Sequence, residues 1–154
     1  MKKFLILSSL YFFVCSVFGA SNELNPFFVF NEDNRAEYAL SMHFNEAEIT
    51  GICIVKKQEE SIVGSVINEF GIKAFDFRYD RKSKKISLLN VISFMDKWYI
   101  KKVIKSDWKY LLSYPDVKRH KKRKITREDG ILGVENTKYN VKYRFTPSTS
   151  GYKK

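Results

Sequence analysis

The sequence contains few of the residues that usually build reactive sites. Its 154 residues include two cysteines and two histidines, His43 and His120, whereas zinc or iron sites need such residues in clusters. We therefore expect no metal site and no cofactor. The sequence also lacks a glycine-rich phosphate loop and a serine in a nucleophile-elbow motif. These absences argue against catalysis, and we interpret the protein as not an enzyme.

The sequence also lacks an apolar run long enough for a membrane-spanning helix at its start. The strongly apolar stretch at residues 4–14 is shorter than the roughly 20 residues that cross a bilayer. Lys2 and Lys3 precede this stretch and the small pair Gly19-Ala20 follows it, a pattern typical of an export signal peptide. We expect residues 1–20 to be a removable signal and the protein to be periplasmic or outer-membrane-associated.

Cys15 leaves a second interpretation of this segment open. A lipoprotein signal also ends its apolar run at a cysteine, which is then acylated. Phe13 and Val14 are bulkier than a lipid-attachment site requires, so we favour the removable signal. If Cys15 is removed, Cys53 is the remaining cysteine and no internal disulfide can form. The single domain expected at residues 21–146 must then be stabilised by packing alone.

Alternating apolar and polar residues predict a series of strands. In residues 38–44, large apolar residues occupy every second position, which is the pattern of a half-buried strand. Similar runs predict strands at 48–57, 62–67, 72–79, 86–92, 130–135 and 139–145. Short polar turns join most of them, which favours antiparallel pairing. We interpret residues 68–71, Asn-Glu-Phe-Gly, as one of these turns, because no second carboxylate or histidine accompanies Glu69 as a reactive partner.

The apolar period changes near Asp96. Apolar residues then recur every three or four positions as far as Ser113, with lysines between them, which predicts an amphipathic helix with Asp96 as its N-cap. We expect this helix to cover the apolar face of the sheet, and a helix lying on a membrane surface is the alternative. The predicted fold is α+β and mainly β: a curved antiparallel meander, or incomplete barrel, of about seven strands with one main helix packed on its concave face.

The net charge of +11 predicts attraction to polyanions. The densest basic run, interrupted by His120, consists of Lys118, Arg119, Lys121, Lys122, Arg123 and Lys124. It has no interleaved aromatic residues to stack on bases, and the export signal also argues against nucleic acid as a partner. A solvated loop and a contact with an anionic membrane surface remain equal alternatives for this run. We expect residues 147–154 to form a disordered basic tail.

The segment ITGICIVKKQEESIVGSVINEFGIKAFDFRYDRKSKKISLLNVI, followed by DKWYIKKVIKSDWKYLL, resembles the lipoprotein-sorting group LolA and LolB and related Bacteroides-type envelope proteins. The likeness lies in the order and spacing of elements over residues 38–112, and NEFGIKAFDF is its most distinctive part. The resemblance implies a half-barrel with a hydrophobic cavity that receives lipoprotein acyl chains. It implies that Phe75, Phe77, Leu88 and Trp98 are cavity or lid residues.

Two hypotheses of function follow. The first is an exported cell-envelope protein that binds a lipid or a lipidated partner, such as lipoprotein acyl chains, in an apolar cavity. The alternative is a structural or adaptor module of the envelope, with a filled core and a basic surface that docks on an anionic membrane or protein.

Overall fold

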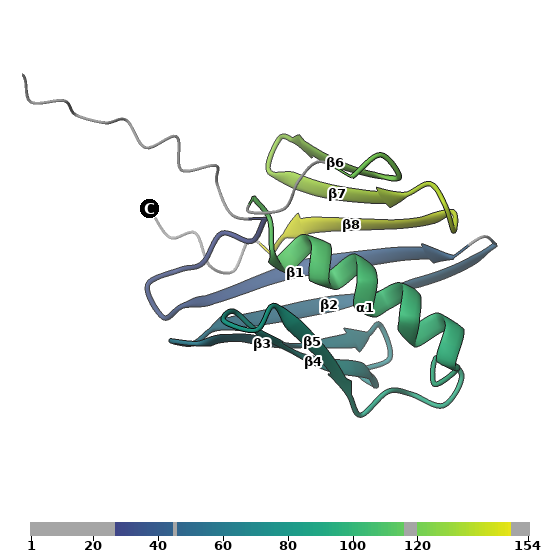
Figure 1. Ribbon diagram of the computed structural model, residues 1–154, viewed down its shortest axis with the longest axis horizontal. Coiled ribbons are helices and arrows are strands. Elements are labelled where there is room, and N and C mark those ends of the chain that lie inside the picture. The colour runs from purple at the N-terminus through teal and green to yellow at the C-terminus, as the bar shows by residue number, and fades with distance from the viewer. Residues whose placement is uncertain (1–26, 45, 116–119, 149–154) are drawn as a thin grey trace, which may run out of the picture.

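The computed structural model describes residues 27–44, 46–115 and 120–148, which form eight strands and one helix (Figure 1). The elements are β1 (Arg35–Phe44), β2 (Ala47–Lys57), β3 (Ser61–Asn68), β4 (Lys73–Asp80), β5 (Lys85–Leu89), α1 (Trp98–Leu112), β6 (Arg123–Glu128), β7 (Ile131–Asn136) and β8 (Val141–Pro147). All neighbouring strands pair antiparallel, in the order β5-β4-β3-β2-β1-β8-β7-β6. The predicted mainly β, antiparallel architecture is confirmed.

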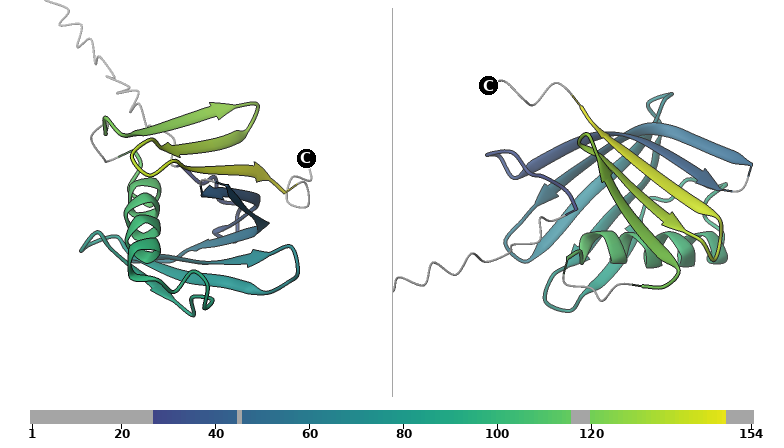
Figure 2. Two further views of the ribbon diagram at one scale, coloured as in Figure 1. Left: turned by 90° about the vertical axis from the view of Figure 1, so that its right-hand side faces the viewer. Right: turned by 90° about the horizontal axis from the view of Figure 1, so that it is seen from above.

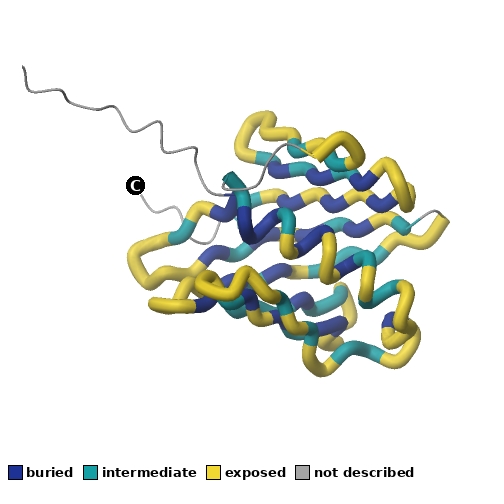
Figure 3. The backbone as a smooth tube through the Cα atoms, viewed as in Figure 1, coloured by how far each residue is buried: buried dark blue, intermediate teal, exposed yellow. Residues whose placement is uncertain are grey.

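The first strand joins the two halves of the sheet. β1 pairs with β2 on one side and with β8 on the other, so Leu40 lies opposite both Gly51 and Phe145. Every second residue of β1 is buried, as the alternation in its sequence predicts, and β8 shows the same pattern (Figure 3). A Cβ at Gly51 would overlap the main chain at Ile67 and Asn68, so the close approach of β2 and β3 requires a glycine there.

The sheet curves but does not close into a barrel. Its two edge strands, β5 and β6, do not pair with each other. Figure 2 shows that the sheet bends around one side and that α1 lies on the open side, between the two edges. Ile104, Trp108 and Leu111 of α1 are fully buried. The helix therefore covers the apolar face that an open, curved sheet would otherwise expose to water.

The helix begins one residue later than predicted. Its N-cap is Lys97, which makes no side-chain capping hydrogen bond, so the prediction that Asp96 caps the helix is wrong. The Asp96 carboxylate instead forms an ion pair with Lys101, at 2.5 Å. The helix ends at Leu112, with Ser113 as its C-cap.

The prediction of about seven strands missed β6. The sequence of β6, RKITRE, contains one large apolar residue, Ile125, and its first two residues belong to the basic run, for which we expect a solvated loop or a contact with an anionic surface. An edge strand needs only the backbone hydrogen bonds to its single neighbour, here β7, and charged side chains are common along such edges. Apolar alternation is therefore a weak signal for a strand at this place in the sheet.

Several other boundaries also differ from the predictions. β5 ends at Leu89 rather than at residue 92, and Asn90, which follows it, has a positive φ of 49°. β8 extends to Pro147, and the backbone N–H of Ser148 donates to the carbonyl of Glu37, so the sheet extends into the segment predicted to be a tail. The predicted signal at residues 1–20 and the tail from residue 149 onward lie outside the described residues.

The Asn-Glu-Phe-Gly stretch at residues 68–71 forms the predicted turn between β3 and β4. The Asn68 side-chain oxygen accepts hydrogen bonds from the backbone N–H groups of Phe70, at 3.1 Å, and Ile72, at 2.8 Å. Gly71 has a φ of 76°, a conformation that glycine adopts without steric cost. The Glu69 carboxylate accepts a hydrogen bond from the Thr50 hydroxyl. This stretch therefore ends one strand and starts the next.

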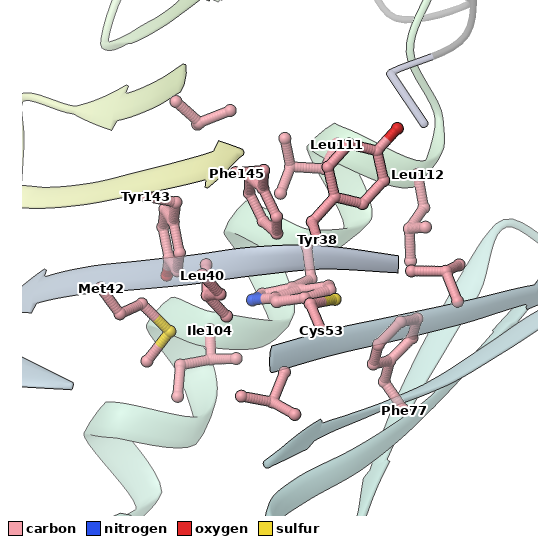
Figure 4. Close-up of a cluster of buried hydrophobic side chains, with 14 of the residues drawn as sticks. Tyr38, Leu40, Met42, Cys53, Phe77, Ile104, Leu111, Leu112, Tyr143 and Phe145 are labelled. Carbon is pink, nitrogen blue, oxygen red and sulfur yellow. The ribbon is translucent and has the colours of Figure 1, made fainter. Parts of the chain in front are cut away.

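The core is centred on Trp108. Its ring centroid lies 4.6 Å from that of Phe77 and 5.8 Å from that of Phe145, so it contacts strands from both halves of the sheet. Phe27 and Phe28, which precede β1, are also buried, and the ring centroids of Phe28 and Trp108 are 6.4 Å apart. Figure 4 shows other members of this cluster, among them Met42. Large aromatic side chains thus fill the space between the sheet and the second half of the helix.

Replacing the central tryptophan should greatly destabilise the protein. Trp108→Ala removes a fully buried indole, so we expect the free energy of unfolding to fall by about 3–5 kcal/mol. Urea denaturation measures this loss. Trp98→Ala is the matched control, because its side chain is 74% exposed and the change should cost less than about 0.5 kcal/mol. Equal losses in the two variants would contradict the structure.

Candidate functional site: an apolar pocket beneath the start of the helix

A pocket of about 310 Å³ lies between the sheet and the first half of α1. Among the described residues, its walls carry no charged side chain. They are formed by Phe44 of β1, Ala47 and Ile49 of β2, Val141 of β8, Ile100 and Val103 of α1, Phe94 and Met95 of the β5–α1 loop, and Tyr99 and Tyr139. The volume is at the lower end of the range of about 300–1,000 Å³ typical of small-molecule sites. It suits one apolar group or the end of one hydrocarbon chain.

The pocket exists because the buried face of α1 changes along its length. Trp108 fills the space under the second half of the helix, whereas the first half presents the smaller side chains Ile100 and Val103 to the same face of the sheet. Both of these side chains are only partly buried, whereas Ile104, which lies one turn after Ile100, is fully buried. A gap therefore remains at the end of the sheet where β2 and β8 begin.

Exposed aromatic side chains surround this pocket. We use the name aromatic rim for Phe94, Trp98, Tyr99 and Tyr139, which are 55%, 74%, 54% and 42% exposed. Three of them line the pocket, and the ring of Trp98 packs edge-on against that of Tyr99, with centroids 5.9 Å apart. Large aromatic residues are costly to leave in water, so a cluster of four of them beside an apolar pocket indicates a binding surface.

Lysine side chains lie beside the aromatic rim. The Lys138 ammonium group is 4.7 Å from the centroid of the Tyr139 ring. A hydrogen bond from Lys138 lowers the pKa of Tyr139, and the charges of Lys138, Lys102 and Arg123 act in the same direction. The surface around the pocket is thus apolar and positively charged.

Larger hollows, of about 420, 520 and 600 Å³, differ from this pocket in having charged walls. The largest is lined by Lys56, Lys73, Asp76 and Arg78, together with apolar residues of β2 to β5. Asp76 in that hollow has a lowered pKa: burial acts to raise it, but hydrogen bonds from Ser65, Asn90 and Lys73 outweigh that effect. The Asp76 carboxylate is thus already occupied by Ser65, Asn90 and Lys73, so the apolar pocket is the stronger candidate site.

The residues that the resemblance assigns to a cavity occupy three different environments. Phe75 and Phe77 are fully buried against Trp108, so they belong to the filled part of the core. Leu88 is half-buried on β5. Trp98 lies in the aromatic rim but does not line the pocket. The structure does not bring these four residues together around one cavity.

The basic run is also divided among different environments. Lys118 and Arg119 lie outside the described residues. Lys121 and Lys122 are exposed in a turn, and Lys124 is exposed on β6. Arg123 differs from them, because only 11% of its side chain is exposed and its guanidinium group pairs with Asp107. Arg123 is therefore not available for a surface contact.

Asp107 is a buried charged residue that the sequence analysis did not single out. Its Oδ1 atom accepts hydrogen bonds from Arg123 Nε, at 2.8 Å, and Asn136 Nδ2, at 2.7 Å, and its Oδ2 atom accepts one from the Tyr143 hydroxyl, at 3.0 Å. These partners come from β6, β7 and β8, so one carboxylate connects α1 to three strands. The signal in the sequence was an aspartate within the apolar stripe, between Ile104 and Leu111. Because these partners belong to strands of the sheet, we assign Asp107 a structural role: it acts as a polar tether that holds the helix against the sheet.

The pocket itself was not predicted either. Its walls come from three parts of the chain that are far apart in sequence, 44–49, 94–103 and 139–141, and Tyr139 was predicted to lie within a strand although it occupies the β7–β8 turn. The available signal was the density of aromatic residues at 94–99, outside the regular apolar stripe of the helix. Cys53 adds no reactivity, because burial in the core raises the pKa of its thiol.

Removing the buried carboxylate should destabilise the protein much more than removing an exposed one. Asp107→Ala leaves Arg123, Asn136 and Tyr143 without their acceptor, so we expect a loss of about 3–5 kcal/mol in the free energy of unfolding. The control is Asp96→Ala, which removes the exposed pair with Lys101 and should cost less than about 1 kcal/mol. Chemical denaturation of both variants tests the comparison, and similar losses would contradict it.

The same carboxylate should contribute a pH dependence of known sign. Burial raises the pKa of Asp107 above its ordinary value of 3.8, although hydrogen bonding and the charge of Arg123 act in the opposite direction. A group with a raised pKa contributes stability that is fully present below its unfolded pKa and is lost as the pH rises through its folded pKa. The free energy of unfolding of the wild type, measured relative to that of Asp107→Asn, should therefore decrease as the pH rises above about 4. Urea denaturation over a pH series measures this relative stability, and an increase in the relative stability of the wild type with pH would contradict the prediction.

Comparisons with known proteins do not indicate what this site binds. No family model, curated protein or solved structure matches the chain. Among the described residues, no group of three or more His, Cys, Asp and Glu side chains is placed to hold a metal ion. No helix in the described ranges is long and apolar enough to cross a membrane. The apolar pocket and its rim are therefore the features on which a function must be argued.

Proposed function

We propose that the protein is a non-enzymatic binding protein of the cell envelope that takes an apolar group of a lipid or a lipidated partner into the pocket beneath the start of α1. The observation that carries this proposal is the uncharged, 310 Å³ pocket whose mouth is formed by exposed Phe94, Tyr99 and Tyr139. A hydrocarbon chain has the same chemistry as these walls, so its transfer from water into the pocket is favourable.

The size of the pocket limits how much of a ligand it can hold. A volume of 310 Å³ is small for a ligand site, and the remaining space beneath the helix is filled by Trp108 and the rings around it. The pocket therefore takes the end of one chain, and the rest of the ligand stays outside it. This differs from a cavity that encloses several acyl chains.

The filled part of the core supports the second candidate function. Phe75, Phe77 and Trp108 pack closely in the place where the resemblance implies a cavity. A structural or adaptor module needs only such a solid core and a surface that meets its partner. Under this alternative the pocket has no ligand, and the exposed lysines dock on an anionic membrane or protein.

Filling the pocket should separate the two functions. Ile49 lines the pocket on β2, so Ile49→Trp places an indole in the space that the ligand would occupy. We expect binding of a fluorescent fatty acid to weaken at least about tenfold, which corresponds to about 1.4 kcal/mol. Fluorescence titration in buffer without membranes measures the affinity.

The matched control for this titration is on the same strand. Ile52→Trp introduces the same side chain at a 43% exposed position that does not line the pocket, and it should leave the affinity unchanged. Circular dichroism and urea denaturation of both variants exclude unfolding as the cause. Absence of fatty-acid binding by the wild type, or equal effects of the two changes, would reject the pocket proposal and favour the adaptor.

A further inference from the structure

The aromatic rim has the residue types of a membrane-contacting surface. Phe94 lies in the β5–α1 loop, Trp98 and Tyr99 lie in the first turn of α1, and Tyr139 lies in the β7–β8 turn, so three separate segments contribute. Tryptophan and tyrosine are enriched at the boundary between lipid and water, where their rings reach the acyl region and their polar atoms remain hydrated. A surface that exposes all four rings is therefore suited to a partner that offers both an apolar and a hydrated environment.

The lysines near the rim distinguish a lipid surface from a protein partner. Lys97, Lys102 and Lys138 are exposed, and within the described residues none of them lies within 4 Å of a carboxylate. Lysine is depleted in the interfaces between proteins, whereas lysines beside aromatic rings are typical of segments that meet anionic head groups. Asp96, an acidic residue within the same segment, is already neutralised by its ion pair with Lys101.

We propose that the aromatic rim and the lysines Lys97, Lys102 and Lys138 form the surface by which this protein docks on an anionic lipid bilayer. The rings enter the boundary region and the three ammonium groups contact lipid phosphates. This inference rests on the proposed function and adds the orientation of the protein on the membrane. Phe94, Tyr99 and Tyr139 belong both to the docking surface and to the pocket walls. A docked molecule turns its pocket mouth toward the acyl chains, so a chain end enters the pocket without crossing water.

The proposed surface differs from the basic run suggested by the sequence. In that run, Arg123 is committed to Asp107, and Lys121, Lys122 and Lys124 are exposed without any large exposed aromatic residue among them. Such lysines attract an anionic surface at a distance but provide no apolar anchor. The two sets of lysines therefore form matched groups of three for an experiment.

The fluorescence of Trp98 reports on docking. The chain has two tryptophans, and Trp108 is fully buried, so a change in emission when vesicles are added reports on Trp98. With vesicles of phosphatidylcholine and phosphatidylglycerol, we expect a blue shift and quenching by brominated acyl chains. Both effects should disappear in Trp98→Phe, which changes an exposed side chain and keeps the core intact. Vesicles of phosphatidylcholine alone should produce neither effect.

The charge variants test which lysines dock. Replacing Lys97, Lys102 and Lys138 together by Gln should weaken vesicle binding by on the order of 100-fold, because each lysine near an anionic surface contributes to the affinity. The matched triple replacement of Lys121, Lys122 and Lys124 by Gln should weaken it by less than about tenfold. Vesicle sedimentation measures both affinities. An equal or larger effect of the second triple, or vesicle binding with unchanged Trp98 emission, would overturn this docking surface.

Failure of this inference and failure of the pocket proposal give different results. Fatty-acid uptake in buffer together with no vesicle binding overturns the docking surface and leaves the pocket in place. Vesicle binding with the expected Trp98 response, together with no uptake in buffer, supports the docking surface and rejects the pocket. No response in either assay rejects both.

Discussion

Trp108 packs the helix against both halves of the curved sheet. Its indole contacts Phe75 and Phe77 of β4 on one side and Tyr143 and Phe145 of β8 on the other. The edge strands β5 and β6 do not pair, so no backbone ladder closes the sheet. The helix covers the apolar face that water would otherwise reach, and Trp108 is the largest of its buried side chains. Among the described residues its Nε1 atom has no hydrogen-bond partner, so the contacts of this ring there are the apolar ones.

The polar tether at Asp107 acts at the position next to Trp108 and complements it. Trp108 packs against the middle of the sheet, whereas Asp107 binds Arg123, Asn136 and Tyr143 toward the β6 edge. Apolar packing is tolerant of small rotations, but three hydrogen bonds to one carboxylate restrict the helix to one orientation. The first half of α1 has no comparable anchor among the described residues, and its buried face carries the smaller Ile100 and Val103. The pocket and the aromatic rim both lie at this less densely packed end.

The filled core bears on the cavity that the resemblance to the lipoprotein-sorting group implies. The curved sheet and its covering helix do not test that resemblance, and Phe75 and Phe77, which it implies are cavity residues, form part of a solid core. A binding role therefore depends on the smaller pocket at the end of the sheet and on the surface around it. The proposals for ligand uptake and for bilayer docking share the residues Phe94, Tyr99 and Tyr139, so both concern one end of the molecule.

The sequence by itself determined the antiparallel strands with strong alternation, the amphipathic helix and the turn at Asn68, because these depend on neighbouring residues and local periodicity. It did not reveal β6, whose charged residues are stable in a strand only because β7 supplies the hydrogen bonds. Only the tertiary structure decided that Arg123 is paired with Asp107 while the nearby Lys121, Lys122 and Lys124 remain exposed. It alone also created the pocket, since that space depends on how far the helix stands from β1, β2 and β8, a distance that local sequence does not encode.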